Sequence, residues 1–224
     1  RCIFHVSDEP AKRQLRAYSK AAQIIHKNFS GFKITDTLSD FSFYEKGVVE
    51  PPLPATDHIE PFIGKVPELW AYYCGAQGRK YVSNRFFGMP AERNRIIGYQ
   101  LYKFDVKGFL HWGYNFYYSR FSKRLIDPFT EPDADGKFPS GDSFVVYPGK
   151  NNMPLDSTRL HVFFDGLQDL RALRLLESLV GREKAVSVLE SGLEKPLTFS
   201  EYPHSAEWLL QTRERINSEI KKKL

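Results

Sequence analysis

Short apolar runs alternate along the chain with longer segments whose apolar residues recur at helical spacing. The first run, Arg-Cys-Ile-Phe-His-Val-Ser over residues 1–7, stops at a charged pair followed by Pro10 and predicts a buried strand. A helix is predicted next, over residues 11–28, because proline is favoured where a helix begins and the apolar positions repeat every three or four residues. These positions are Leu15, Tyr18, Ala22 and Ile25.

The same alternation continues to about residue 118. Strand-like runs are predicted at residues 31–36, 54–62, 68–75 and 108–118, and a helix at residues 93–106. Residues 119–156 are rich in Pro, Gly and Asp, which predicts a long loop, and one short extended piece lies at residues 143–147.

The last third of the chain is predicted to be helical. A wide apolar stripe predicts a long helix over residues 157–180, with Ser157 as its N-cap. Shorter helices are expected at residues 182–191 and 205–223. We therefore divide the chain into a catalytic barrel segment, residues 1–191, and a linker with a C-terminal helix packed on it, residues 192–224.

The order of elements indicates an α/β fold. Strands that alternate with helices and are too apolar to have a solvated face form parallel sheets of βα units. Five such units are more than half of a (β/α)8 barrel, which typically has about 250 residues. The sheet is therefore either open and doubly wound, or these are the C-terminal five βα units of a TIM-type barrel whose first three units are absent from this chain.

Composition and charge narrow the classes of function. The chain has 224 residues, of which 42% are hydrophobic, enough for a sizeable core. Its net charge of +5 is dispersed rather than gathered in a stripe among stacking aromatics, which argues against nucleic-acid binding. No apolar run approaches the roughly 20 residues needed to cross a bilayer, so no membrane association is expected. Cys2 and Cys74 are too few for a disulfide framework or a metal site, and we expect both to be small buried residues.

Candidate chemistry lies at the predicted strand ends, where parallel α/β folds gather reactive side chains. The set is rich in acids, aromatics and amides, and it contains neither a Cys-His cluster nor a glycine-rich phosphate loop. Sugars present apolar faces to aromatic rings and hydroxyls to acids and amides, so this set is typical of carbohydrate sites. Its members are Asp8, Glu9, Asp36, Asp57, His58, Tyr72, Tyr73, Trp112, Tyr114 and Asn115.

The adjacent acids Asp8 and Glu9 are the strongest candidates. Cleavage of a glycosidic bond needs a proton donor and a group that stabilises an oxocarbenium-like centre, and two carboxyls can divide this work if Glu9 holds the proton while Asp8 stays charged. The alternative is that both acids merely begin the following helix, where carboxylates interact favourably with the helix dipole. The spacing alone does not decide between these interpretations.

Several stretches in order resemble glycoside hydrolase family 123, the β-N-acetylgalactosaminidase family, over residues 4 to about 176. They are His5-Val6-Ser7-Asp8-Glu9-Pro10, Leu69-Trp70-Ala71-Tyr72-Tyr73-Cys74, Gly108-Phe109-Leu110-His111-Trp112-Gly113-Tyr114-Asn115, Gly141-Asp142 with Tyr147-Pro148-Gly149, and Arg159 leading to Asp165-Gly166-Leu167-Gln168-Asp169. Their order and spacing together are more specific than any one of them.

The resemblance implies a (β/α)8 barrel behind a β-sandwich and a retaining, substrate-assisted mechanism with no cofactor and no metal. In that mechanism the 2-acetamido oxygen of the sugar attacks its own anomeric carbon. Asp8 corresponds to the residue that polarises the acetamido group, and Glu9 to the general acid/base. Weaker assignments make Tyr72 a donor to the acetamido oxygen, Trp112 a wall of the sugar subsite, and Asn115 and Asp57 ligands of sugar hydroxyls.

The resemblance also implies what this chain lacks. The first three barrel strands normally complete the pocket, so we expect the open side to be covered by a missing N-terminal segment or by self-association. For Trp70 and Cys74 we favour core packing, while Asp142 and the turn at residues 147–149 either line the site or shape the loop.

Three interpretations of function follow. The first is a glycosidase that removes terminal β-linked N-acetylhexosamine, for which the family resemblance implies N-acetylgalactosamine, from a glycan or glycoconjugate. The second is a non-catalytic carbohydrate-binding or scaffold fragment of such an enzyme, and the third is an unrelated open α/β enzyme.

Overall fold

The computed structural model describes residues 2–78 and 81–224, so Arg1 of the first predicted strand lies outside it. It forms an α/β chain with small sheets that divides into two compact units. The strand unit comprises residues 1–73 and 104–110, and the helical unit comprises residues 74–103 and 111–224. We describe each unit by itself.

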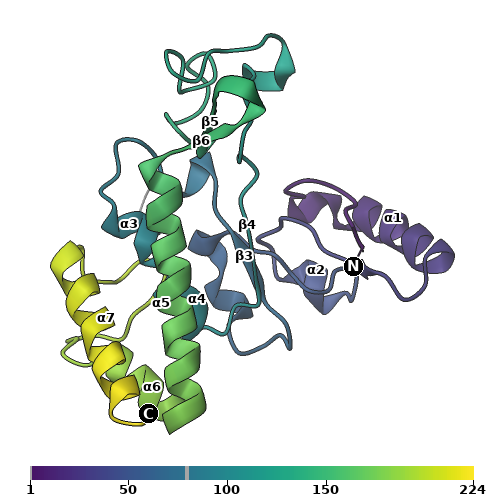
Figure 1. Cartoon of the computed structure of the whole chain (residues 1–224). Coiled ribbons are helices and arrows are strands. Elements are labelled where there is room, and N and C mark those ends of the chain that lie inside the picture. Colours follow the sequence, from purple (N-terminus) through teal and green to yellow (C-terminus); the bar gives the residue numbers. More distant parts are fainter. Residues whose placement is uncertain (1, 79–80) are drawn as a thin grey trace. The chain divides into compact units, whose positions relative to one another are not determined.

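The strand unit begins with a β-α-β arrangement. Strand β1 (Ile3–Phe4) pairs in parallel with β2 (Lys33–Ile34). Helix α1 (Leu15–Asn28), labelled in Figure 1, connects the two strands. A short helix, α2 (Ser42–Glu45), follows β2. The predicted helix after the first strand is therefore confirmed, with a single turn of 3-10 helix at residues 12–14 before it.

Parallel pairing continues through the rest of this unit. Strand β3 (Trp70–Tyr72) pairs in parallel with β4 (Gly108–Leu110). Between β2 and β3 lies the extended segment 53–55, which forms one parallel bridge with Thr37 and another with Tyr72. Five extended segments therefore follow one another in parallel, although only four are long enough to count as strands.

The predicted strands at residues 1–7 and 54–62 need correction. Only Ile3 and Phe4 of the first segment pair as a strand, and Ile3 is 38% exposed rather than buried. In the second segment only the first residues are extended, and residues 56–58 and 60–62 form 3-10 helices. Pro61 stands at the start of the second 3-10 helix, where its missing N–H costs nothing, whereas in a strand it would remove a ladder hydrogen bond.

The helical unit is built around one long helix, α5 (Thr158–Val180), drawn in green in Figure 1. It packs against α4 (Ile97–Lys103), α6 (Arg182–Leu189) and α7 (Ala206–Lys221), whose inward side chains form one apolar core. The short helix α3 (Glu92–Arg95) lies just before α4 in the sequence. Ser157 and Ser205 cap α5 and α7 by accepting hydrogen bonds from the backbone N–H of Leu160 and Trp208, which confirms the N-cap prediction for Ser157.

Two contacts hold α5 in place. Helices α4 and α5 approach closely at Gly98, where an added Cβ would lie 1.8 Å from the carbonyl oxygen of Gly166. Asp169 of α5, which is fully buried, pairs with Arg95 of α3 at 2.7 Å and with Arg213 of α7 at 2.8 Å. The hydrogen bond to Asp169 raises the pKa of Arg95, which keeps the guanidinium charged. The Asp169 carboxylate therefore joins α3, α5 and α7 through charged hydrogen bonds.

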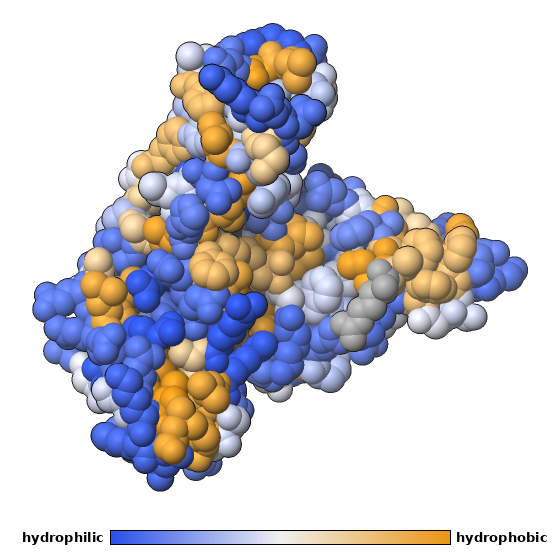
Figure 2. All heavy atoms as spheres, viewed as in Figure 1, coloured by the Kyte–Doolittle hydropathy of each residue, from blue (hydrophilic) through white to orange (hydrophobic). Residues whose placement is uncertain are grey.

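The long loop predicted over residues 119–156 carries a small antiparallel hairpin of β5 (Val146–Pro148) and β6 (Pro154–Asp156). The extended piece predicted at residues 143–147 corresponds in part to β5. Hydrophobic and hydrophilic surfaces alternate over the segment that contains the hairpin (Figure 2). The exposed large apolar side chains of residues 119–156 are Phe121, Leu125, Phe129, Met153 and Leu155.

The cysteines differ from expectation. Cys2 is exposed and Cys74 is half-buried, so neither is the small buried residue that the sequence predicts. Trp70 is likewise only half-buried, with its indole N–H donating to Glu68 Oε1 at 3.0 Å. No helix within residues 2–78 and 81–224 is both long and apolar enough to cross a membrane.

Candidate active site

Asp8 and Glu9 lie in a bend between β1 and α1, which we call the acid turn (residues 6–10). The 3-10 helix begins only at Lys12, after Ala11, and α1 begins at Leu15. Neither helix has an acidic residue in its first turn. The alternative that the two acids merely begin the following helix is therefore wrong. Both side chains are exposed, and Glu9 has a left-handed backbone with φ 42°.

One hydroxyl contacts both halves of the acid pair. Thr37, three residues after the end of β2, donates a hydrogen bond from Oγ1 to Asp8 Oδ1 at 2.8 Å. The same oxygen accepts a hydrogen bond from the backbone N–H of Glu9 at 3.3 Å. The turn is thus fastened to the end of the neighbouring strand.

The neighbour of Thr37, Asp36, anchors the start of the acid turn. Its carboxylate is fully buried and accepts hydrogen bonds from the backbone N–H of Val6 at 2.9 Å and 3.1 Å. Asp36 also accepts a hydrogen bond from the hydroxyl of Tyr18. Its Oδ1 lies 3.0 Å from Nδ1 of His5. Burial, together with this bond to Asp36, raises the pKa of Tyr18, so its phenol stays a donor.

Tyr72, at the end of β3, reaches the other acid. Its hydroxyl donates to Glu9 Oε1 at 2.5 Å, and its ring is almost completely buried. Three strand ends, those of β1, β2 and β3, therefore supply the groups around the acid pair. Of the residues predicted from sequence, Asp8, Glu9 and Tyr72 are brought together.

Asp57 has a different neighbour. It sits half-buried in the 3-10 helix at residues 56–58, and its Oδ1 lies 2.7 Å from Nδ1 of His58. This contact is local to adjacent residues. The partner of Asp57 is therefore His58, and its predicted role as a ligand of sugar hydroxyls stays a prediction.

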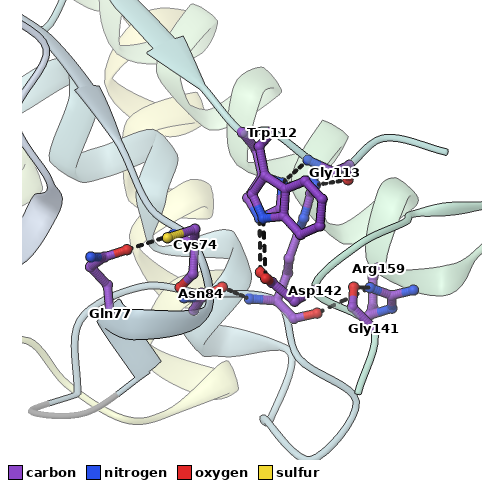
Figure 3. A network of polar contacts seen from close by, with 10 residues as sticks. Cys74, Gln77, Asn84, Trp112, Gly113, Gly141, Asp142 and Arg159 are labelled. Carbon is purple, nitrogen blue, oxygen red and sulfur yellow. Dashed lines mark hydrogen bonds and ion pairs between the residues drawn. The ribbon is translucent and has the colours of Figure 1, made fainter. Parts of the chain in front are cut away.

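Trp112 and Asn115 belong to the helical unit, and Trp112 is part of a polar network (Figure 3). Its indole N–H donates to Asp142 Oδ2 at 3.1 Å, while 40% of the side chain is exposed. Edge contacts with Phe116 and Phe138, at ring-centroid distances of 5.2 Å and 5.1 Å, fix the indole plane. Trp112 thus presents an apolar ring from a rigid support.

The support beneath Trp112 is a buried histidine–aspartate pair. His111 Nε2 lies 3.3 Å from Asp142 Oδ1, and both side chains are almost fully buried. His111 Nδ1 accepts from the N–H of Gly113 at 3.0 Å and from the guanidinium of Arg85 at 2.5 Å. These two donors place the imidazole proton on Nε2, facing Asp142. Burial lowers the pKa of His111 to about 4, with Arg85 adding to the shift and Asp142 opposing it.

Asn115 is exposed and forms a single antiparallel bridge with Phe144. The bridge joins the segment after β4 to the segment before β5. Gly113 lies at the same crossing, and an added Cβ there would meet the backbone of Asp142 and Ser143 at 2.6–2.7 Å.

The sequence analysis did not select Thr37 and left the role of Asp142 open. Thr37 follows a predicted strand end, and that position is the signal by which it could have been found. Asp142 was left as a rim or loop residue, and the structure buries it to 1% exposure as the acceptor for Trp112. Within residues 2–78 and 81–224, no group of three or more His, Cys, Asp or Glu side chains is arranged to hold a metal ion.

The chain resembles known glycoside hydrolases in sequence and in fold. The model of the glycoside hydrolase 123 catalytic domain matches residues 1–176. Among solved structures, the chain is similar to a family 123 glycoside hydrolase from Clostridium perfringens, analysed for its hydrolysis of glycolipid glycans, with a TM-score of 0.64 and 18% identity. The match covers 98% of this chain and 39% of that enzyme. Comparison with curated proteins gave no match.

Proposed function

The chain belongs to the glycoside hydrolase 123 catalytic-domain family, and on that basis we propose that it carries the acid pair of a retaining glycosidase. The substrate class is a glycan or glycoconjugate that ends in β-linked N-acetylhexosamine, with N-acetylgalactosamine preferred. The similar enzyme from Clostridium perfringens, which acts on glycolipid glycans, makes a glycolipid headgroup a reasonable source of that sugar.

The observation that carries this proposal is the acid turn itself. Two adjacent carboxylates stand outside any helix, and each is held by a different strand end, Asp8 by Thr37 and Glu9 by Tyr72. Carboxylates that only stabilise a helix would lie in its first turn. Separate supports for the two acids fit separate chemical roles.

The proposed mechanism follows the substrate-assisted class. Glu9 donates its proton to the glycosidic oxygen as the bond to the anomeric carbon breaks, and the 2-acetamido oxygen attacks that carbon. Asp8 accepts the acetamido N–H and stabilises the positive charge of the oxazolinium-like intermediate. Glu9 then removes a proton from water, which opens the ring and restores the acetamido group with retained configuration.

Tyr72 is proposed to reach the acetamido oxygen once substrate is bound, because its hydroxyl already lies at Glu9. Trp112 is proposed as the apolar wall of the sugar subsite, and Asn115 and Asp57 as ligands of sugar hydroxyls. The role of Trp112 as an apolar wall is supported by its exposed ring and by the hydrogen bond from its indole N–H to Asp142.

We also propose that the strand unit is part of a (β/α)8 barrel contributing five βα units. The support is the succession of β1, β2, segment 53–55, β3 and β4 in parallel order, since consecutive parallel neighbours are the pattern of such a barrel. The division into a barrel segment, residues 1–191, and a C-terminal segment, residues 192–224, stays a prediction.

The test is hydrolysis of nitrophenyl β-N-acetylgalactosaminide by the whole protein and its variants. We expect Glu9→Gln and Asp8→Asn to lower kcat by about 10²–10⁴-fold, the usual contribution of a positioned acid or base. Glu45→Gln, an exposed glutamate in α2, is the matched control and should leave kcat unchanged. Activity that survives Glu9→Gln would overturn the assignment of the general acid.

A second substrate separates the mechanism from the activity. Nitrophenyl β-galactoside lacks the 2-acetamido group and should be cleaved far more slowly. Equal rates on both substrates would exclude substrate assistance. Binding of N-acetylgalactosamine without any turnover by the wild type would instead favour a carbohydrate-binding protein.

A further inference from the structure

The most informative unassigned group in the strand unit is the hydroxyl of Thr37. A threonine hydroxyl has one hydrogen and two acceptor lone pairs. The Glu9 backbone N–H can only donate to it, so its own hydrogen is directed to Asp8 Oδ1. One side chain therefore occupies one oxygen of Asp8 and fixes the peptide plane of Glu9.

Thr37 is itself held rigidly. Its two neighbours, Asp36 and Leu38, are buried, and the N–H of Leu38 donates to the carbonyl of Leu53 at 3.1 Å. Thr37 also forms the parallel bridge with Leu53. A β-branched side chain has few χ1 rotamers, so the hydroxyl has little freedom to move.

We propose that Thr37 is a positioning residue for Asp8. This inference rests on the proposed function of the acid pair. By taking Asp8 Oδ1, the hydroxyl leaves Oδ2 to accept the acetamido N–H and sets the angle at which it does so. Thr37 does not touch the substrate and acts through the orientation of Asp8.

A purely structural role is the competing explanation, because the same hydroxyl closes the acid turn through the Glu9 N–H. The two roles predict different couplings. Residues that act as a unit show strongly non-additive effects, whereas independent effects on the fold and on catalysis add. A double-mutant cycle with Asp8 therefore decides between them.

The cycle compares the wild type, Thr37→Val, Asp8→Ala and the double variant of the whole protein on nitrophenyl β-N-acetylgalactosaminide. Thr37→Val should lower kcat about 10- to 100-fold with little change in KM, since the polarised acetamido group matters most in the transition state. In the Asp8→Ala background the same substitution should change kcat less than about 2-fold. Thr37→Ser keeps the hydroxyl and should retain most activity.

The outcomes are distinct. An inactive wild type overturns the proposed function, whereas an active wild type with a fully active Thr37→Val overturns only the role of Thr37. Equal losses in both backgrounds also overturn it, because the residue would then act through the fold.

A measurement without activity accompanies the cycle. Hydrogen exchange by mass spectrometry over residues 6–10 should be faster in Thr37→Val than in Thr37→Ser, because the Glu9 N–H loses its acceptor. Identical exchange in the two variants would show that the hydroxyl does not hold the turn.

Discussion

The hydroxyl of Tyr72 donates a hydrogen bond to Glu9 Oε1 across 63 residues of sequence. The bond links the end of β3 to the turn after β1, so that two strand ends meet at one carboxylate. A general acid must hold its proton in a defined direction toward the leaving oxygen. Before substrate binds, Tyr72 holds the carboxyl of Glu9, the proposed general acid, in one direction.

Tyr72→Phe removes that donor and little else. We expect kcat to fall about 2- to 12-fold, since a hydrogen bond between neutral groups contributes about 0.5–1.5 kcal/mol. The loss should be larger on nitrophenyl β-N-acetylgalactosaminide than on nitrophenyl β-galactoside, because only the first substrate carries the acetamido oxygen that Tyr72 is proposed to reach. Steady-state kinetics on the two substrates measures the difference. Tyr44→Phe, in α2, is the control, and an equal loss in both variants would contradict a specific role for Tyr72.

Acid should destabilise the helical unit through His111. Its pKa of about 4 in the folded protein lies below the ordinary value of 6.5. Between these values the unfolded state binds a proton that the folded state lacks, so the free energy of unfolding falls as the pH falls from about 6.5 to about 4. The loss is on the order of 3 kcal/mol, since one pKa unit corresponds to about 1.4 kcal/mol.

Urea unfolding at pH 7 and pH 4.5 measures this loss. Part of the pH dependence should disappear in His111→Gln and remain in His161→Gln, which changes an exposed histidine of α5. A wild-type pH dependence equal to that of His111→Gln would contradict the buried neutral histidine.

Gly98→Ala should disrupt the contact between α4 and α5. The added methyl group would lie 1.8 Å from the carbonyl oxygen of Gly166, and this backbone atom cannot rotate away. We expect a loss of about 3 kcal/mol or more, at the upper end of overpacking effects. Thermal unfolding measures it. Gly88→Ala, where nothing lies within 4 Å of an added Cβ, should unfold like the wild type.

Asp169→Asn should separate the helices that this carboxylate joins. Removing one partner of a buried ion pair costs about 3–5 kcal/mol, because the arginines keep their desolvated charges. The free energy of unfolding in urea is the measurement. Asp135→Asn removes an exposed partner of Arg124 and should cause no measurable change. Similar effects of the two substitutions would contradict the difference in burial.

Local signals account for the parts of the fold that the sequence predicted correctly. Helices α1, α5, α6 and α7 follow the apolar spacing, and Ser157 caps α5 as predicted. Segment 54–62 has the apolar content of a strand, yet its prolines and its contacts with neighbouring segments favour 3-10 turns. Such tertiary effects are not encoded in local periodicity.

The site shows the same division. Position at predicted strand ends made Asp8, Glu9 and Tyr72 candidates, and the family resemblance supplied the role predicted for each. Sequence spacing could not tell an acid turn from a helix start, because that distinction depends on Thr37, which lies 29 residues from Asp8. Asp142 was similarly undecided, since its partner Trp112 lies 30 residues away.

The left-handed backbone of Glu9 has a consequence for the evolution of this turn. At φ 42° a side chain with a Cβ is strained, and glycine would adopt the same conformation without strain. A turn optimised for folding alone would therefore carry glycine at position 9. Under the proposed function, a glutamate at this position exchanges stability for chemistry, and stabilising the turn with glycine would remove the proposed general acid.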